Sequence, residues 1–66
     1  MRVRKLLRHA DNGVDKVEVT YNGQTLISGD SLDVFRSDYA DSKVDLFGVY
    51  PDDDGKIVMC IAVKGK

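Results

Sequence analysis

The sequence is poor in the residues that build most catalytic and metal sites. It contains one cysteine, one histidine and no tryptophan. A lone Cys60 cannot form an internal disulfide, and Cys60 together with His9 supplies too few ligands for a structural zinc site. A Cys–His nucleophilic pair also needs a group that orients it, and Cys60 stands in an apolar run that predicts a buried, inert thiol. We therefore expect no catalytic residue, no metal and no cofactor, and we interpret the chain as not an enzyme.

Long hydrophobic runs are also missing. The longest run, Ile57–Val63, has seven residues, whereas a membrane span needs about 20. The basic start of the chain is followed only by Leu6-Leu7, which is too short for the core of a signal peptide. The sequence therefore predicts a cytoplasmic protein with no membrane partner.

Residues 1–66 are expected to form a single domain. Hydrophobic residues make up 42% of the chain, which is enough for one compact core and unlike a disordered chain. A chain of this length buries only about 60% of its unfolded surface, and here no disulfide or metal is expected to support it. Either the core is sufficient alone, or a second copy or another partner extends it.

The first ten residues have helical spacing. Val3, Leu6, Leu7 and Ala10 form an apolar stripe at positions i, i+3, i+4 and i+7, and Asp11-Asn12-Gly13 ends it. A helix this short is not stable alone in water. We therefore expect it to cover one face of a sheet.

From Val14 the apolar period changes to two, which is typical of a half-buried strand. Asn22-Gly23 follows this strand and predicts a hairpin with a type I′ turn. The expected strand pairs are Tyr21–Gln24, Thr20–Thr25, Val19–Leu26, Glu18–Ile27 and Val17–Ser28. This register places Leu26 on the core face and Ile27 on the opposite face.

The segment after the first hairpin has a helix start signal. Asp30-Ser31 offers an N-cap, and acidic Asp33 falls in the first turn. Leu32, Phe35 and Tyr39 recur at helical spacing. A short helix over roughly 31–37 is expected, with an ordered loop as the alternative.

The last third of the chain predicts a second hairpin, with strands at 44–50 and 56–63 and a turn at Pro51–Gly55. The final strand is apolar on both faces, so it belongs inside the sheet. Gly48 marks a bulge or the close approach of another backbone. In the strand at 44–50, the expected faces are Val44, Leu46 and Tyr50 on one side and Phe47 and Val49 on the other.

Together these elements predict an α+β fold. A short N-terminal helix packs on a four-stranded, mostly antiparallel sheet made of two β-hairpins. Asp52-Asp53-Asp54-Gly55 resembles part of a calcium loop, but the EF-type spacing would place Ile61 where a bidentate glutamate is required. We interpret this acidic segment as a hairpin turn.

Charge is unevenly distributed, although the net charge is only −1. Residues 1–10 carry four cations, and residues 30–54 carry eight aspartates against two cations. The basic helix could contact nucleic acid, but a pI of about 5.6 is untypical of nucleic-acid modules. The acidic half could instead mimic DNA and inhibit a host enzyme, although turns also collect aspartate for local reasons.

Binding of an unknown protein partner, with a homodimer as one form, is the function that the sequence favours. A free sheet edge and an uncovered sheet face are the expected docking surfaces. The candidate interaction residues are Ile27, Phe47 and Val49 on the sheet, and Arg4 and Arg8 on the helix. Nucleic-acid binding through the basic helix and acidic mimicry of DNA are the alternatives.

The order of these features resembles the small proteins of phages and integrated mobile elements of Gram-positive bacteria. The segments that carry the resemblance are Val3-Arg4-Lys5-Leu6-Leu7, Asn22-Gly23, the step from Leu26 to Gly29, Val44, Val49-Tyr50-Pro51 and Asp54-Gly55-Lys56-Ile57-Val58. The resemblance spans most of the chain and rests on hydrophobic pattern and turn residues. It implies a short accessory protein that acts by binding, and it assigns no activity and no functional residue.

Overall fold

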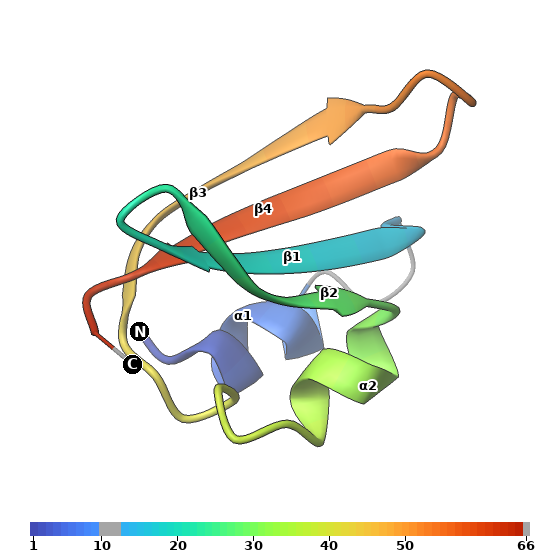
Figure 1. Cartoon of the computed structure of the whole chain (residues 1–66). Helices are drawn as coiled ribbons and strands as arrows, with labels where there is room; N and C mark the ends of the chain where they lie inside the picture. The colour runs from blue at the N-terminus through green and yellow to red at the C-terminus, as the bar shows by residue number, and fades with distance from the viewer. Residues whose placement is uncertain (10–12, 66) are drawn as a thin grey trace.

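A four-stranded sheet with two short helices on one face forms the fold (Figure 1). The computed structural model describes residues 1–9 and 13–65. The elements in chain order are α1 (Val3–His9), β1 (Lys16–Tyr21), β2 (Gln24–Gly29), α2 (Ser31–Phe35), β3 (Val44–Pro51) and β4 (Ile57–Val63). This arrangement confirms the predicted α+β class and the helix on the sheet.

The strands lie in the order β2-β1-β4-β3. Both hairpins, β1–β2 and β3–β4, are antiparallel, while the central pair β1–β4 is parallel. The sheet is therefore mixed and mostly antiparallel. The prediction that the strand at 56–63 lies inside the sheet is confirmed, because β4 pairs with β1 on one side and with β3 on the other.

The first hairpin has the predicted turn but a different register. Asn22 and Gly23 have φ values of 52° and 78°, as a type I′ turn requires. The pairs Tyr21–Gln24 and Thr20–Thr25 are as predicted, but a bulge then pairs Val19 with Ile27. The prediction that Ile27 faces away from the core is wrong, because the extra residue in the bulge shifts every later pair by one. Leu26 and Ile27 both pack against the core.

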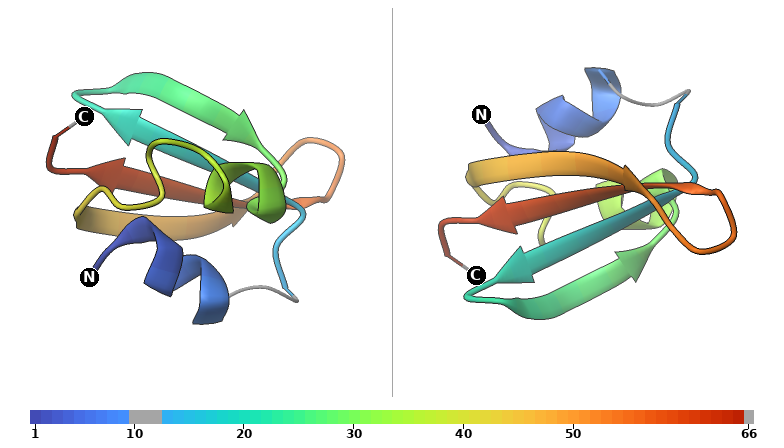
Figure 2. Two further views of the ribbon diagram at one scale, coloured as in Figure 1. Left: turned by 90° about the horizontal axis from the view of Figure 1, so that it is seen from below. Right: turned by 90° about the horizontal axis from the view of Figure 1, so that it is seen from above.

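The core lies between the sheet and the two helices. Its buried side chains come from both helices and both central strands: Val3, Leu6, Leu7, Val17, Val19, Val34, Met59, Ile61 and Val63. Both helices lie on the same side of the sheet (Figure 2, left). We call this side the helix face.

Helix α1 confirms most of the predicted N-terminal helix. Its buried residues are Val3, Leu6 and Leu7, which are the predicted stripe. Ala10 and the predicted stop at residues 11–12 lie outside the described residues. None of the helices in the described ranges is long enough and apolar enough to cross a membrane.

Helix α2 begins at the predicted cap. The Asp30 carboxylate accepts a hydrogen bond of 2.8 Å from the backbone N–H of Asp33. Within this helix Val34 is buried and Leu32 is exposed. The side of the helix that is buried most deeply is therefore the Val34 side and not the Leu32 side. The structure thus gives a helix over five residues, followed by turns up to β3.

A second bulge lies at the start of β3. Val44 pairs with Val63 and Leu46 pairs with Ala62, so Asp45 is the extra residue. The bulge reverses the face of the residues before it, and Val44 packs against the core instead of sharing a face with Leu46. The bulge expected at Gly48 is therefore at Asp45, and Gly48 pairs regularly with Cys60.

Candidate interaction surface

Strand β3 is the edge strand that leaves the most apolar surface in contact with solvent. It pairs with β4 on one side only. Four of its large side chains remain exposed, Leu46 by 63%, Phe47 by 49%, Val49 by 53% and Tyr50 by 43%. An edge strand of this kind presents unpaired backbone groups beside apolar side chains, which suits the addition of another strand.

The hydrogen-bonding pattern identifies which backbone groups of β3 point outward. The N–H of Asp52 donates inward to the carbonyl of Lys56 at 2.8 Å. Because donors alternate along an antiparallel strand, the N–H and C=O groups of Tyr50 and Gly48 also point toward β4. Those of Phe47 and Val49 therefore point out of the sheet.

Both ends of this outer edge are closed to pairing. At the start, the N–H of Val44 donates to the Met1 carbonyl at 2.8 Å, and the N–H of Val3 donates to the Ser42 carbonyl at 3.0 Å. At the other end Pro51 has no N–H to donate, and such prolines are typical of edge strands. The open stretch is therefore short, and Gly48 lies at its midpoint.

The side of the sheet away from the helices is uncovered. Cross-strand partners share a face, so Leu46, Gly48 and Tyr50 lie with Ala62, Cys60 and Val58. We call this side the open face, and no described helix lies over it (Figure 2, right). Cys60 is half-buried there, less than the buried thiol that was predicted, because the open face has no covering helix.

Tyr50 has a perturbed environment on the open face. Partial loss of hydration raises the pKa of Tyr50 above its ordinary value of 10.0, and the neighbouring Glu18, Cys60 and Asp52 raise it further. A raised pKa means that the folded state holds the phenol proton more tightly than the unfolded state does.

The Tyr50→Phe variant is therefore expected to lose less stability than the wild type as the pH rises past 10.0. The unfolded phenol ionises first, so the contribution of Tyr50 is complete below the unfolded pKa and is lost as pH rises through the folded pKa. Urea unfolding of both proteins on either side of this pH measures the difference. Parallel curves of unfolding free energy against pH would contradict the assignment.

The predicted interaction residues of the sheet do not share one surface. Phe47 and Val49 are exposed at the β3 edge, on the helix face, because they pair with Ile61 and Met59. Ile27 is half-buried on β2, at the opposite edge of the sheet. Sequence reasoning missed Leu46 and Tyr50 as exposed apolar residues. The sequence does show that this strand is apolar on both faces. Its edge position, which leaves these residues exposed, follows only from the topology.

Arg4 and Arg8 hold the two helices together. Their guanidinium carbons lie 4.8 Å and 5.6 Å from the centroid of the Phe35 ring, within the range of cation–π attraction. Arg4 also pairs with the Asp41 carboxylate at 3.3 Å. These contacts give both arginines a structural role and occupy two of the cations on which the nucleic-acid alternative depends.

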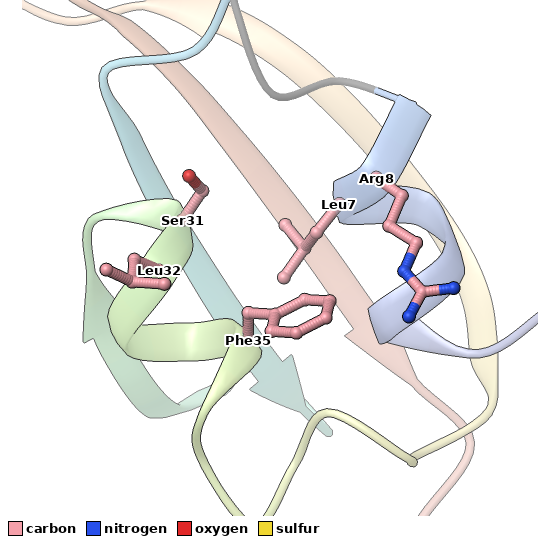
Figure 3. Close-up of a pocket in the computed structure, with 5 residues that line it drawn as sticks. All are labelled: Leu7, Arg8, Ser31, Leu32 and Phe35. Atoms are coloured by element: carbon pink, nitrogen blue, oxygen red, sulfur yellow. The ribbon is translucent and has the colours of Figure 1, made fainter.

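A small apolar cavity lies between α1 and α2 next to these arginines. It has a volume of about 210 Å³ and is lined by Leu7, Arg8, Ser31, Leu32 and Phe35. Leu7 and Phe35 point toward each other across it, with the Arg8 guanidinium beside the ring (Figure 3). Its lining has one hydroxyl and one guanidinium, so it offers few groups that could orient a ligand.

The segments that flank β3 carry opposite charge. Before β3, the backbones of Lys43 and Arg2 form an isolated antiparallel β-bridge. The backbone N–H of Lys64 donates to the Lys43 carbonyl. At the far end lies the turn Asp52–Asp54. The Asp52 carboxylate accepts hydrogen bonds of 2.9 Å from the backbone N–H groups of Asp54 and Lys56. Asp52 therefore has a local role in forming the turn.

The residues considered for chemistry are not assembled into a site. His9 ends α1 on the helix face, whereas Cys60 faces the open side, so the sheet separates them. Among the described residues no group of three or more His, Cys, Asp or Glu side chains could hold a metal ion.

Comparison with known proteins adds no family to this picture. No protein-family model matches the chain, and no curated protein or solved structure matches it either.

Proposed function

We propose that this chain is a protein-binding module that accepts a strand from another polypeptide at the outer edge of β3. The observation that carries the proposal is the exposure of Leu46, Phe47, Val49 and Tyr50 beside the outward backbone groups of Phe47 and Val49. An added strand would satisfy those backbone groups and cover apolar side chains on both faces of the sheet.

The edge also sets the chemistry of the partner strand. Its backbone must be extended, and its side chains must be apolar at both faces because β3 is apolar on both. Only two outward N–H groups, those of Phe47 and Val49, lie between the Asp45 bulge and Pro51. Affinity must therefore depend on side-chain contacts as well as on the backbone bonds.

Selection from a displayed random-peptide library tests this proposal. The wild type is expected to select extended peptides with apolar residues, and Val49→Pro is expected to weaken their binding at least about tenfold by removing an outward donor and blocking the edge. Because the Val49 N–H points away from β4, this variant keeps its pairing within the sheet.

Leu32→Lys is the matched control, because Leu32 on α2 has the same 53% exposure as Val49. It removes an exposed apolar side chain far along the chain from β3. Selected peptides should bind this control as they bind the wild type. Peptides that bind Val49→Pro as tightly as the wild type would refute the role of the β3 edge.

A further inference from the structure

We infer that the strand added to β3 is the β3 strand of a second copy of this chain, paired antiparallel about a two-fold axis at Gly48. This inference rests on the proposed function and names its partner. The two sheets would join into one continuous eight-stranded sheet with all helices on the same face, because a two-fold axis between antiparallel strands stands perpendicular to the sheet.

The positions of the outward donors select this register. In an antiparallel pair, a hydrogen-bonded pair of residues exchanges two N–H···O bonds. Centring on Gly48 places Phe47 opposite Val49 of the second copy, and Val49 opposite Phe47 of the second copy. Both outward donors of each chain are then used, which gives four bonds between the chains.

The neighbouring registers are poorer. Centring on Phe47 leaves Val49 opposite the bulged Asp45, and centring on Val49 places Phe47 opposite Pro51, which has no N–H. The register centred on Val49 also brings Asp45 of one copy toward Asp53 of the other, and like charges directly opposite each other are unfavourable.

The exposed side chains match in the same register. On the open face Leu46 lies opposite Tyr50 of the second copy, and on the helix face Phe47 lies opposite Val49. All four large apolar side chains that are exposed on β3 in the single chain therefore gain an apolar neighbour across the junction. Aromatic side chains beside aliphatic ones are favourable cross-strand pairs.

Gly48 fits the centre of this junction and is not required by the single chain. It is not among the glycines with positive φ, and a Cβ placed on it would meet nothing within 4 Å. A glycine inside a strand lowers stability, so its presence needs another reason. At the centre, the two Gly48 residues form a non-hydrogen-bonded pair, in which the Cα atoms approach to about 4.5 Å.

Charge complementarity supports a second copy as the occupant. The two-fold axis brings the basic residues beside the start of β3, Arg2 and Lys43, next to the turn Asp52–Asp54 of the second copy. Symmetry makes this contact twice. Both flanking segments therefore favour an antiparallel partner strand that also has basic residues before it and acidic residues after it, as a second copy does.

Sedimentation equilibrium over a wide range of concentration tests the inference. The mass is expected to rise from 7.3 kDa to twice that value, and Val49→Pro is expected to remain at the monomer mass while Leu32→Lys dimerises as the wild type does. A wild type that stays monomeric throughout would overturn the inference. If the library peptides still depend on Val49 in that case, the proposed function stands without the homodimer.

A charge exchange tests the register. Asp53 is chosen because, unlike Asp52, it accepts no turn hydrogen bond among the described residues. Lys43→Glu and Asp53→Lys are each expected to weaken dimerisation about tenfold, because each places like charges together twice, and the double variant is expected to restore it. A double variant no better than the single ones would overturn the register.

A cross-link tests the symmetry axis in a Cys60→Ala background. Gly48→Cys is expected to form a disulfide-linked dimer under mild oxidation, since two residues at the axis lie within the Cα separation that a disulfide needs. Leu46→Cys is the control and is expected not to cross-link, because residue 46 of one copy lies four positions along the junction from residue 46 of the other. Cross-linking of Leu46→Cys but not of Gly48→Cys would overturn the proposed axis.

Discussion

Replacing Ile61 with alanine is expected to lower the free energy of unfolding by about 3–4 kcal/mol, within the range for a buried isoleucine. Ile61 lies in the middle of β4, is 0% exposed, and pairs with Val19 on one side and Phe47 on the other. The cavity left by its side chain would lie where both helices meet the sheet. A two-state domain of 66 residues has a total stability of about 3–10 kcal/mol, so this substitution should remove a large fraction of the total stability.

Urea unfolding followed by circular dichroism measures this effect, with Leu32→Ala as the control. Leu32 is 53% exposed on α2, and its truncation is expected to cost less than about 1 kcal/mol. Equal losses in the two variants would mean that β4 is not the centre of the core.

Replacing Phe35 with alanine is expected to cost about 2–3 kcal/mol, somewhat less than the truncation of a fully buried phenylalanine. Phe35 is half-buried and packs against the core. Its ring also lies under the guanidinium groups of Arg4 and Arg8. The substitution therefore removes apolar contact and two cation–π contacts together, and it should loosen α1 from α2.

Phe35→Leu separates the two contributions, because leucine keeps most of the apolar volume and has no π-face. It is expected to recover more than half of the loss caused by alanine, since cation–π contacts at exposed sites contribute only about 0.5–1 kcal/mol each. Amide exchange in α1, residues 3–9, reports the loosening directly. Unchanged exchange there in Phe35→Ala would show that Phe35 does not hold α1.

Local patterns predicted most of the elements. Asn22-Gly23 identified the first turn because both residues accept positive φ, and Asp30 identified the start of α2 through its carboxylate. The two apolar faces of residues 57–63 identified the strand that lies inside the sheet. Each of these signals depends only on neighbours along the chain.

The faces of the edge strands could not be predicted in the same way. The bulges after Thr25 and at Asp45 each insert one residue, and one residue exchanges the two faces of a strand. Neither bulge has a positive-φ glycine that would mark it. Ile27 and Val44 were therefore assigned to the wrong face.

The strand order was the other missing part. The parallel pairing of β1 with β4 joins residues more than 40 positions apart, such as Lys16 and Val58, and no local pattern encodes it. This pairing decides that β3 is an edge strand. The interaction surface therefore depends on a contact between distant segments, and Phe47 and Val49 were selected without knowledge of the edge.

Amide hydrogen exchange at residues 46–50 tests the central claim most directly, namely that β3 is paired on one side and open on the other. In dilute solution the Phe47 and Val49 amides are expected to exchange rapidly, while the Leu46, Gly48 and Tyr50 amides are protected by β4. At high concentration the Phe47 and Val49 amides should become protected as a second strand is added. Protection of both amides in a sample shown to be monomeric would contradict an open edge.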